Sequence, residues 1–225
     1  MKSTKNSTVL VVAAHPDDET LGCGATIAKH ASRGDMVFIH ILGEGAMSRQ
    51  NAERTHVDSL REFAVEAGKV LGAQGVVFEN LPDNRFDTVA LLTVVQKVES
   101  VIDRFRPQIV YTHDPGDLNI DHKLTYQAVL TATRPCAALF VKEVFSFEVP
   151  SASEWQFEPA FAPNVFVSVS PADMEKKIEA LACYKSEIRE APYPRSPEII
   201  RALARVRGSA VMSEYAEAFR LVRKI

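Results

Sequence analysis

The chain carries two clusters of histidine and acidic side chains that could bind a metal ion. The first is His15-Pro16-Asp17-Asp18-Glu19, which follows the apolar run 9–14. Because His15 and Asp18 are three residues apart across a strand-to-helix turn, both side chains can point at one centre. An imidazole nitrogen and a carboxylate oxygen suit zinc or another divalent transition metal, and Asp17 stays close enough to act on a metal-bound water. The same residues also fit a plain helix start, with proline in the first turn and acids near the positive end of the dipole.

The second cluster lies in residues 111–122, after another short β-branched run. His122 could supply a third protein ligand and leave a fourth position open for water, as a catalytic zinc site requires. Asp121 could orient a neighbouring group as an outer carboxylate. The alternative is a polar turn at 114–117 followed by an Asx-type cap.

Elements of two kinds alternate along the chain and must position these clusters. Short β-branched runs predict strands at 9–14, 36–42, 75–78, 109–112 and 143–147, and longer periodic segments predict helices at 20–32, 51–71, 91–105 and 121–133. This alternation indicates a three-layer, Rossmann-like α/β fold with a mostly parallel sheet and helices on both faces. In the strand order 3-2-1-4-5, the first and fourth strands are neighbours at the switch point where ligands bind. The two clusters then face each other across one cleft, which favours a shared metal or catalytic site.

The rest of the chain is expected to complete a single domain over residues 1–225. Its core spans about 8–150, and a C-terminal extension spans about 151–225. Within the extension we predict an irregular loop at 151–163, an edge strand at 165–169, and helices at 171–184 and 197–207.

Composition excludes several classes of protein. The 225 residues include 26 basic and 29 acidic side chains, and 46% are hydrophobic, so intrinsic disorder is excluded. A net charge of −3 gives no basic surface for nucleic acid. No apolar run reaches the roughly 18 residues of a spanning helix, so we expect no membrane insertion. Three widely spaced cysteines form no disulfide framework, which favours the cytoplasm.

Three segments resemble a known family. Residues 14–19 read Ala-His-Pro-Asp-Asp-Glu, which is the first motif of the LmbE-like, PIG-L-type zinc-dependent de-N-acetylases. The pair Asp121-His122 resembles the end of that family's second motif, and residues 215–219 resemble its C-terminal pattern. The resemblance covers nearly the whole chain. It implies a zinc-dependent hydrolase that removes the acetyl group from an N-acetylated amino sugar of the N-acetylglucosamine type.

The resemblance also implies roles for single residues. Zinc would bind His15, Asp18 and His122, and Asp17 would be the general base for a metal-bound water that attacks the amide. Many family members have a histidine at the position of Asn119, where it stabilises the oxyanion. Asparagine can donate a hydrogen bond there but cannot carry a proton, so the general acid is left open. The substrate would be a small N-acetylated sugar conjugate, and homo-oligomers occur in the family.

Other residues are weaker candidates. His113 could stand in for the missing histidine, or it could be a turn residue. Arg85 or Asp83, in the loop 81–87, could hold sugar hydroxyls or a phosphate, and Arg195, in a proline-rich loop, would suit an anionic group on the substrate. Both arginines could equally be surface ions. Trp155, the only tryptophan, could stack on a sugar or pack internally.

Two other functions compete with the deacetylase. A metal-dependent phosphoesterase acting on a sugar phosphate or nucleotide would usually need ligands for two metals, and the donors here suit one. A binding module with a decayed metal site would not need the intact set of His15, Asp17, Asp18 and His122.

Overall fold

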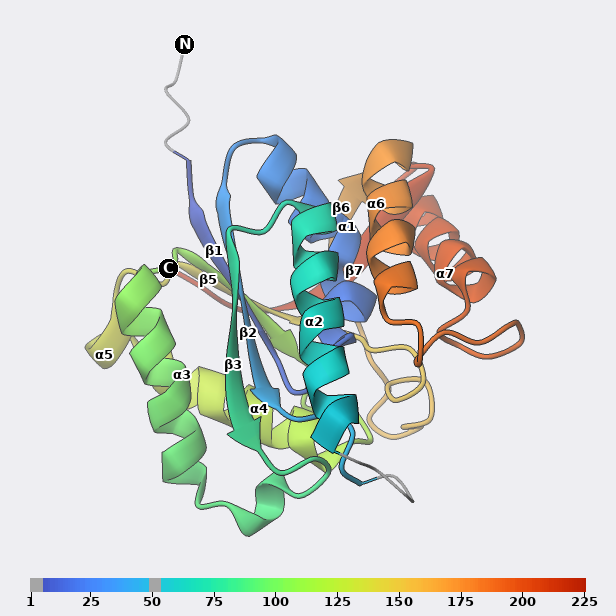
Figure 1. The fold of residues 1–225 in the computed structure, drawn as a ribbon. Coiled ribbons are helices and arrows are strands. Elements are labelled where there is room, and N and C mark those ends of the chain that lie inside the picture. Colours follow the sequence, from blue (N-terminus) through green and yellow to red (C-terminus); the bar gives the residue numbers. More distant parts are fainter. Residues whose placement is uncertain (1–5, 49–53) are drawn as a thin grey trace.

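The computed structural model describes residues 6–48 and 54–225. Its strands form one seven-stranded sheet in the order β3-β2-β1-β4-β5-β7-β6 (Figure 1). They are β1 Thr8–Ala13, β2 Met36–Gly43, β3 Gly75–Leu81, β4 Ile109–His113, β5 Glu143–Phe147, β6 Val165–Val169 and β7 Tyr215–Lys224. The helices are α1 Asp18–Ser32, α2 Arg54–Leu71, α3 Leu91–Phe105, α4 Ile120–Ala132, α5 Pro135–Ala138, α6 Pro171–Cys183 and α7 Pro197–Ser209, with a 3-10 turn, η1, at Phe86–Thr88. No helix of these described ranges is long and apolar enough to cross a membrane.

The first five strands run parallel in the predicted order, which confirms the three-layer α/β fold. Strand β1 is buried along its whole length, and its side chains alternate between two hydrophobic cores. Val9 and Val11 belong to the core under α1, α2 and α6, whereas Leu10 and Val12 belong to the core under α3 and α4. This placement makes β1 the centre of the molecule and puts its carboxyl end between the two helical layers.

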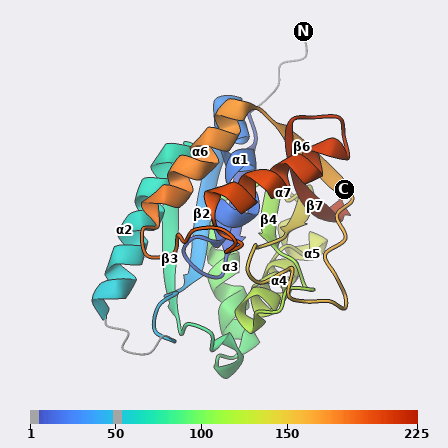
Figure 2. The same cartoon turned by 90° about the vertical axis from the view of Figure 1, so that its right-hand side faces the viewer.

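The C-terminal extension adds two antiparallel strands to the same sheet. β7 pairs with β5 over Glu143↔Lys224 to Phe147↔Phe219, and β6 pairs with β7 at the edge. The sequence predicted the edge strand β6 but not β7. Figure 2 shows α6 and α7 of this extension facing the viewer, and α6 packs against α1 and α2. The extension therefore shares the sheet with residues 8–150, and the single domain over 1–225 stays a prediction.

Helix α1 is kinked at Cys23, where φ is −148° and ψ is 24°. The kink exposes backbone groups that a helix normally pairs internally. Glu217 of β7 accepts hydrogen bonds from the backbone N–H groups of Ala25 and Thr26, and Lys177 of α6 donates to the carbonyl of Leu21. Since Lys177 also pairs with Glu217 at 2.6 Å, one buried ion pair joins both halves of α1 to the extension.

Candidate active site

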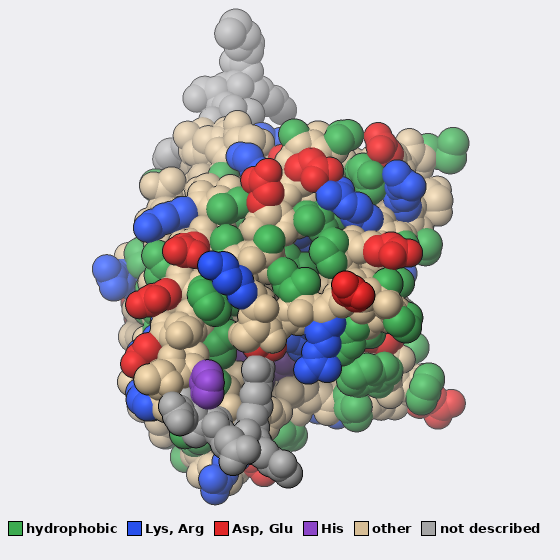
Figure 3. Space-filling model, turned by 45° about the vertical axis from the view of Figure 1, so that its right-hand side comes forward, with side chains coloured by type: hydrophobic (Ala, Val, Ile, Leu, Met, Phe, Trp, Pro, Cys, Tyr) green, Lys and Arg blue, Asp and Glu red, His purple; other side chains and the backbone are tan. Residues whose placement is uncertain are grey.

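A cleft of about 270 Å³ lies at the carboxyl ends of the parallel strands. Loops after β1, β2, β3, β4 and β5 contribute to it, and so does the segment between α6 and α7. Its lining residues are His15, Pro16, Asp17, Asp18, Gly45, Ser48, Asp83, Asn84, Leu118, Asn119, His122, Ser151, Ala152, Trp155, Glu187 and Arg195. In Figure 3, histidine (purple) and acidic (red) side chains are visible at the bottom of a hollow on this face. This is the sheet edge at which the sequence predicted a shared site.

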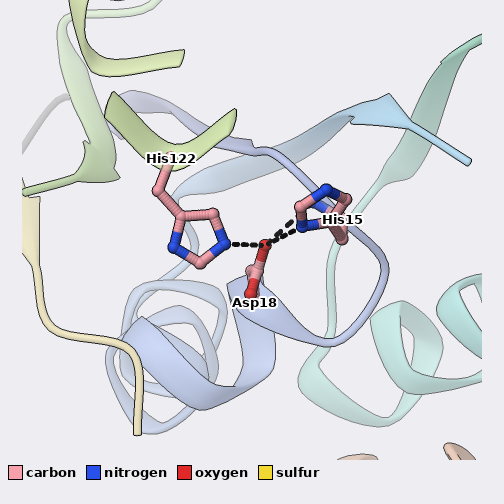
Figure 4. A group of neighbouring side chains, drawn as sticks. All are labelled: His15, Asp18 and His122. Atoms are coloured by element: carbon pink, nitrogen blue, oxygen red, sulfur yellow. Dashed lines mark hydrogen bonds and ion pairs between the residues drawn. The ribbon is translucent and has the colours of Figure 1, made fainter. Parts of the chain in front are cut away.

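His15, Asp18 and His122 converge at the bottom of this cleft (Figure 4). Asp18 Oδ2 lies 3.2 Å from His122 Nε2 and 3.4 Å from His15 Nδ1, and all three residues are buried. With zinc bonds of about 2.0–2.1 Å, tetrahedral ligands lie about 3.3–3.4 Å from one another. The spacing and the donor types therefore fit a zinc-like cation with three protein ligands.

Each of the two histidines has a carboxylate at its second ring nitrogen. Asp121 Oδ2 lies 2.9 Å from His15 Nε2, and Asp117 Oδ2 lies 3.0 Å from His122 Nδ1. Asp121 is fixed in turn because its Oδ1 accepts the backbone N–H of Phe86. Such outer carboxylates hold a ligand histidine in one orientation and tautomer, with the other nitrogen free to bind a metal. The sequence suggested this role for Asp121, whereas Asp117 was placed in the second cluster, or in a polar turn, with no role of its own.

Charge is concentrated around these ligands. Burial by itself lowers the pKa of His15, but the Asp121 and Asp18 carboxylates outweigh it and raise that pKa to about 10. For His122, burial is likewise outweighed by Asp18 and Asp117, and the pKa rises to about 9. With these raised pKa values both imidazoles carry a proton and face the Asp18 carboxylate. A cation that binds the three side chains would displace the imidazole protons.

Asp17 lies beside the three ligands with its backbone in the left-handed region, at a φ of 100°. This conformation costs an L residue about 1–3 kcal/mol and is typical of functional sites. Burial raises the pKa of the Asp17 carboxyl to about 8, against the opposing effect of the Arg195 guanidinium. A carboxylate whose pKa is near neutral suits a general base.

The two predicted substrate-binding arginines differ in position. Arg195 lines the cleft, and its Nη1 lies 2.5 Å from Asp17 Oδ2 while its Nε donates to Ser151 Oγ. Arg85 is exposed before η1, and it is not among the residues that line the cleft. Its role stays a prediction, and its neighbours Asp83 and Asn84 face the cleft instead.

Asn119 is held in one orientation at the start of α4. Its Oδ1 accepts the backbone N–H of Asp121 at 2.8 Å, so it caps the helix, and its Nδ2 donates to Asn84 Oδ1 at 3.0 Å. Because Oδ1 is committed to the cap, the amide presents its donor side to the cleft. This geometry suits a neutral hydrogen-bond donor to a developing oxyanion.

His113 occupies a different kind of position. It is fully buried, its Nε2 accepts the backbone N–H of Ala14, and its ring stacks on His122 with centroids 3.9 Å apart. Burial, followed by the nearby charge of His122, lowers its pKa to about 3, so the ring is neutral. It does not line the cleft, and its contacts suit a support for His122 better than an oxyanion donor. Its catalytic role stays a prediction.

Several cleft residues were not singled out as site residues by sequence reasoning. Ser48 donates from both its N–H and Oγ to Asp83 Oδ2, and Glu187 lies 4.0 Å from Arg195. For Ser48 the sequence offered one signal, namely that the loops after the second and third strands open at the same edge of the sheet as the two clusters. Trp155, left undecided by sequence, lines the cleft.

Residues 10–133 match the model of the family described as PIG-L, GlcNAc-PI de-N-acetylase. The chain belongs to this family. The membership confirms the resemblance, and the match contains both His/Asp clusters.

Relatives cover most of the chain. The uncharacterized deacetylase YaiS of Escherichia coli is 29% identical over 189 residues, which cover 82% of this chain and 94% of that protein. The diacetylchitobiose deacetylase of Thermococcus kodakarensis is 27% identical over 226 residues, 95% of this chain and 82% of that protein. The 4-oxalmesaconate hydratase of Pseudomonas putida is also similar, at 28% identity over 201 residues, 80% of this chain and 74% of that protein. These relatives give no support to the phosphoesterase alternative.

A solved structure shows the same fold. The N,N'-diacetylchitobiose deacetylase of Pyrococcus horikoshii superposes with a TM-score of 0.78 at 19% identity, over 96% of this chain and 84% of that chain. At this level of identity the likeness concerns the fold alone.

Proposed function

We propose that this protein is a zinc-dependent hydrolase that removes the acetyl group from an N-acetylated amino sugar. The observation that carries the proposal is the convergence of His15, Asp18 and His122 beside Asp17 in one cleft. Three protein ligands leave a coordination position for water, and a carboxylate stands next to it. The family description and the chitobiose deacetylase relative supply the class of bond and substrate.

Each side chain of the site can carry out one part of the amide hydrolysis. A divalent cation held by His15, Asp18 and His122 would supply Lewis acidity, which lowers the pKa of water and polarises the amide carbonyl. Asp17 takes a proton from the attacking water as the new C–O bond forms. It then returns that proton to the amide nitrogen, so that the C–N bond breaks and the products are acetate and the free amine. Asn119 Nδ2 donates a hydrogen bond to the oxygen that gains negative charge.

The proposal also covers the metal, the size of the substrate and the cellular location. Zinc is the metal because two imidazoles and one carboxylate are donors that it prefers, although the same donors accept other transition metals. The substrate is a small sugar conjugate, since a cleft of about 270 Å³ is slightly smaller than the roughly 300–1,000 Å³ of drug-sized sites. The cytoplasm is the location, because Cys23, Cys136 and Cys183 are all free thiols.

The test is acetate release from N-acetylglucosamine and N,N'-diacetylchitobiose by the metal-free protein before and after one equivalent of zinc. We expect release only in the reloaded protein, and a strong loss in His122→Ala. A chain that binds zinc but releases no acetate from either sugar would contradict the proposal. Addition of water to an unsaturated dicarboxylate without acetate release would assign the site to hydratase chemistry instead.

A further inference from the structure

The charge of the cleft is predominantly negative. Among the residues that the structure describes, its carboxylates are those of Asp17, Asp18, Asp83 and Glu187, and its cationic side chain is Arg195. The histidines are neutral when they bind a metal. A divalent cation and Arg195 therefore supply three positive charges against four negative ones. If Asp17 holds a proton, the charges balance, and in neither state is there a positive excess to attract an anion.

The single cationic side chain of this lining is already engaged. Arg195 contacts Asp17 at 2.5 Å and lies 4.0 Å from Glu187, while its Nε donates to Ser151. Its side chain is only 19% exposed, which leaves little of the guanidinium for a ligand. A phosphate or carboxylate on the substrate would have to compete with Asp17 for this group and would also approach Glu187. Like charges brought together in a partly buried site repel strongly because screening there is weak.

The uncharged part of the cleft offers contacts of another kind. Trp155 and Leu118 line it with 51% of each residue exposed, so both present apolar surface to a ligand. Flat apolar side chains pack against the C–H faces of sugar rings and against neutral groups joined to them. Asn84 and Asn119 also line the cleft and carry amides that can bond to hydroxyls.

We propose that the site selects uncharged N-acetylamino-sugar conjugates and discriminates against those that carry a phosphate or carboxylate. The inference rests on the proposed deacetylase function and narrows its substrate class. It reverses the sequence-based expectation that Arg195 binds an anionic group of the substrate. In the structure, Arg195 is paired with Asp17, and on this proposal the carboxylates around it repel an anionic substrate.

The experiment compares kcat/KM for acetate release from three N-acetylglucosamine derivatives in the zinc-loaded protein. They are the methyl α-glycoside, the α-1-phosphate and the uridine diphosphate conjugate, which share the α configuration at C1 and differ in the group attached there. We expect the neutral glycoside to exceed both anionic derivatives by at least about tenfold, and the gap to narrow as salt is added. Equal or faster hydrolysis of an anionic derivative would overturn the inference and leave the deacetylase proposal standing. Absence of acetate from all three would instead overturn the deacetylase proposal, and the inference would fall with it.

A pair of variants tests whether the carboxylates cause the discrimination. Glu187→Gln removes a charge from the cleft and keeps the side chains of Asp17 and Asp18. Because the charge of Glu187 helps to raise the pKa of Asp17, the rate on every derivative can change, so the test is the ratio of neutral to anionic kcat/KM. That ratio should fall at least about threefold, on the order of the loss of one weakly screened charge pair. Glu190→Gln makes the same change in the same segment, at an exposed residue outside the cleft lining, and should leave the ratio at the wild-type value. An unchanged ratio in Glu187→Gln, or an equal fall in Glu190→Gln, would contradict the electrostatic explanation.

Discussion

Substitution of Asp121 by asparagine tests how the metal site is held. Asp121 Oδ2 lies 2.9 Å from His15 Nε2, and Oδ1 accepts the N–H of Phe86. In Asp121→Asn one of these oxygens becomes an NH₂ group. That group must face either the imidazole N–H of His15 or the backbone N–H of Phe86, so two donors oppose each other and one hydrogen bond is lost. Loss of an outer carboxylate typically weakens metal binding about 10–100-fold. At about 1.4 kcal/mol per factor of ten, this is about 1.4–2.8 kcal/mol.

The assay is a zinc titration of the metal-free protein against a competing chelator. Asp35→Asn is the matched control, because Asp35 Oδ2 lies 2.7 Å from His30 Nδ1 and Oδ1 accepts the N–H of Ser7, away from the cleft. We expect wild-type zinc affinity in the control and a 10–100-fold weaker affinity in Asp121→Asn, consistent with the role of such carboxylates. Affinity within about twofold of wild type in Asp121→Asn, or an equal loss in the control, would show that Asp121 does not hold His15 for the metal.

Two further predictions concern stability. Glu217→Gln leaves Lys177 buried without its counter-charge, so the free energy of unfolding in urea should fall by about 3–5 kcal/mol, and a loss below about 1 kcal/mol would contradict the role of this pair. Gly22→Ala places a Cβ 2.3 Å from Cδ2 of Phe147, whereas the nearest atom to a Cβ at Gly75 is 3.9 Å away. Gly22→Ala should therefore cost at least about 1–3 kcal/mol in the same assay, and Gly75→Ala should cost much less; similar costs for both would show that the core at Gly22 adapts.

The parallel part of the fold follows from local sequence. Strands such as β1 are continuous buried apolar runs, and they alternate with amphipathic helices, so both their type and their order could be predicted. The strand β7 was missed because Glu217 interrupts its apolar pattern at a buried position. The carboxylate is explained there by Lys177, 40 residues away, and by the backbone N–H groups of Ala25 and Thr26 at the kink of α1. Contacts of this kind form on folding and leave no local periodicity.

The candidate site also contains some residues that could be predicted from the sequence and others that could not. His15, Asp18 and His122 could be proposed from sequence because strand order alone brings the ends of β1 and β4 together. The pairing of Arg195 with Asp17 joins residues 178 positions apart and depends on how the extension folds back over the cleft. Asp117 looked like an ordinary turn residue because its distance from His122 is set by the turn geometry and not by residue type.

Acetate release by Asp17→Asn at full zinc occupancy shows whether Asp17 is the general base. The substitution removes the proposed base but none of the three metal ligands. We predict one zinc per chain in both proteins and a turnover reduced by about a hundred- to ten-thousand-fold in the variant. Wild-type turnover in zinc-loaded Asp17→Asn would contradict this role of Asp17.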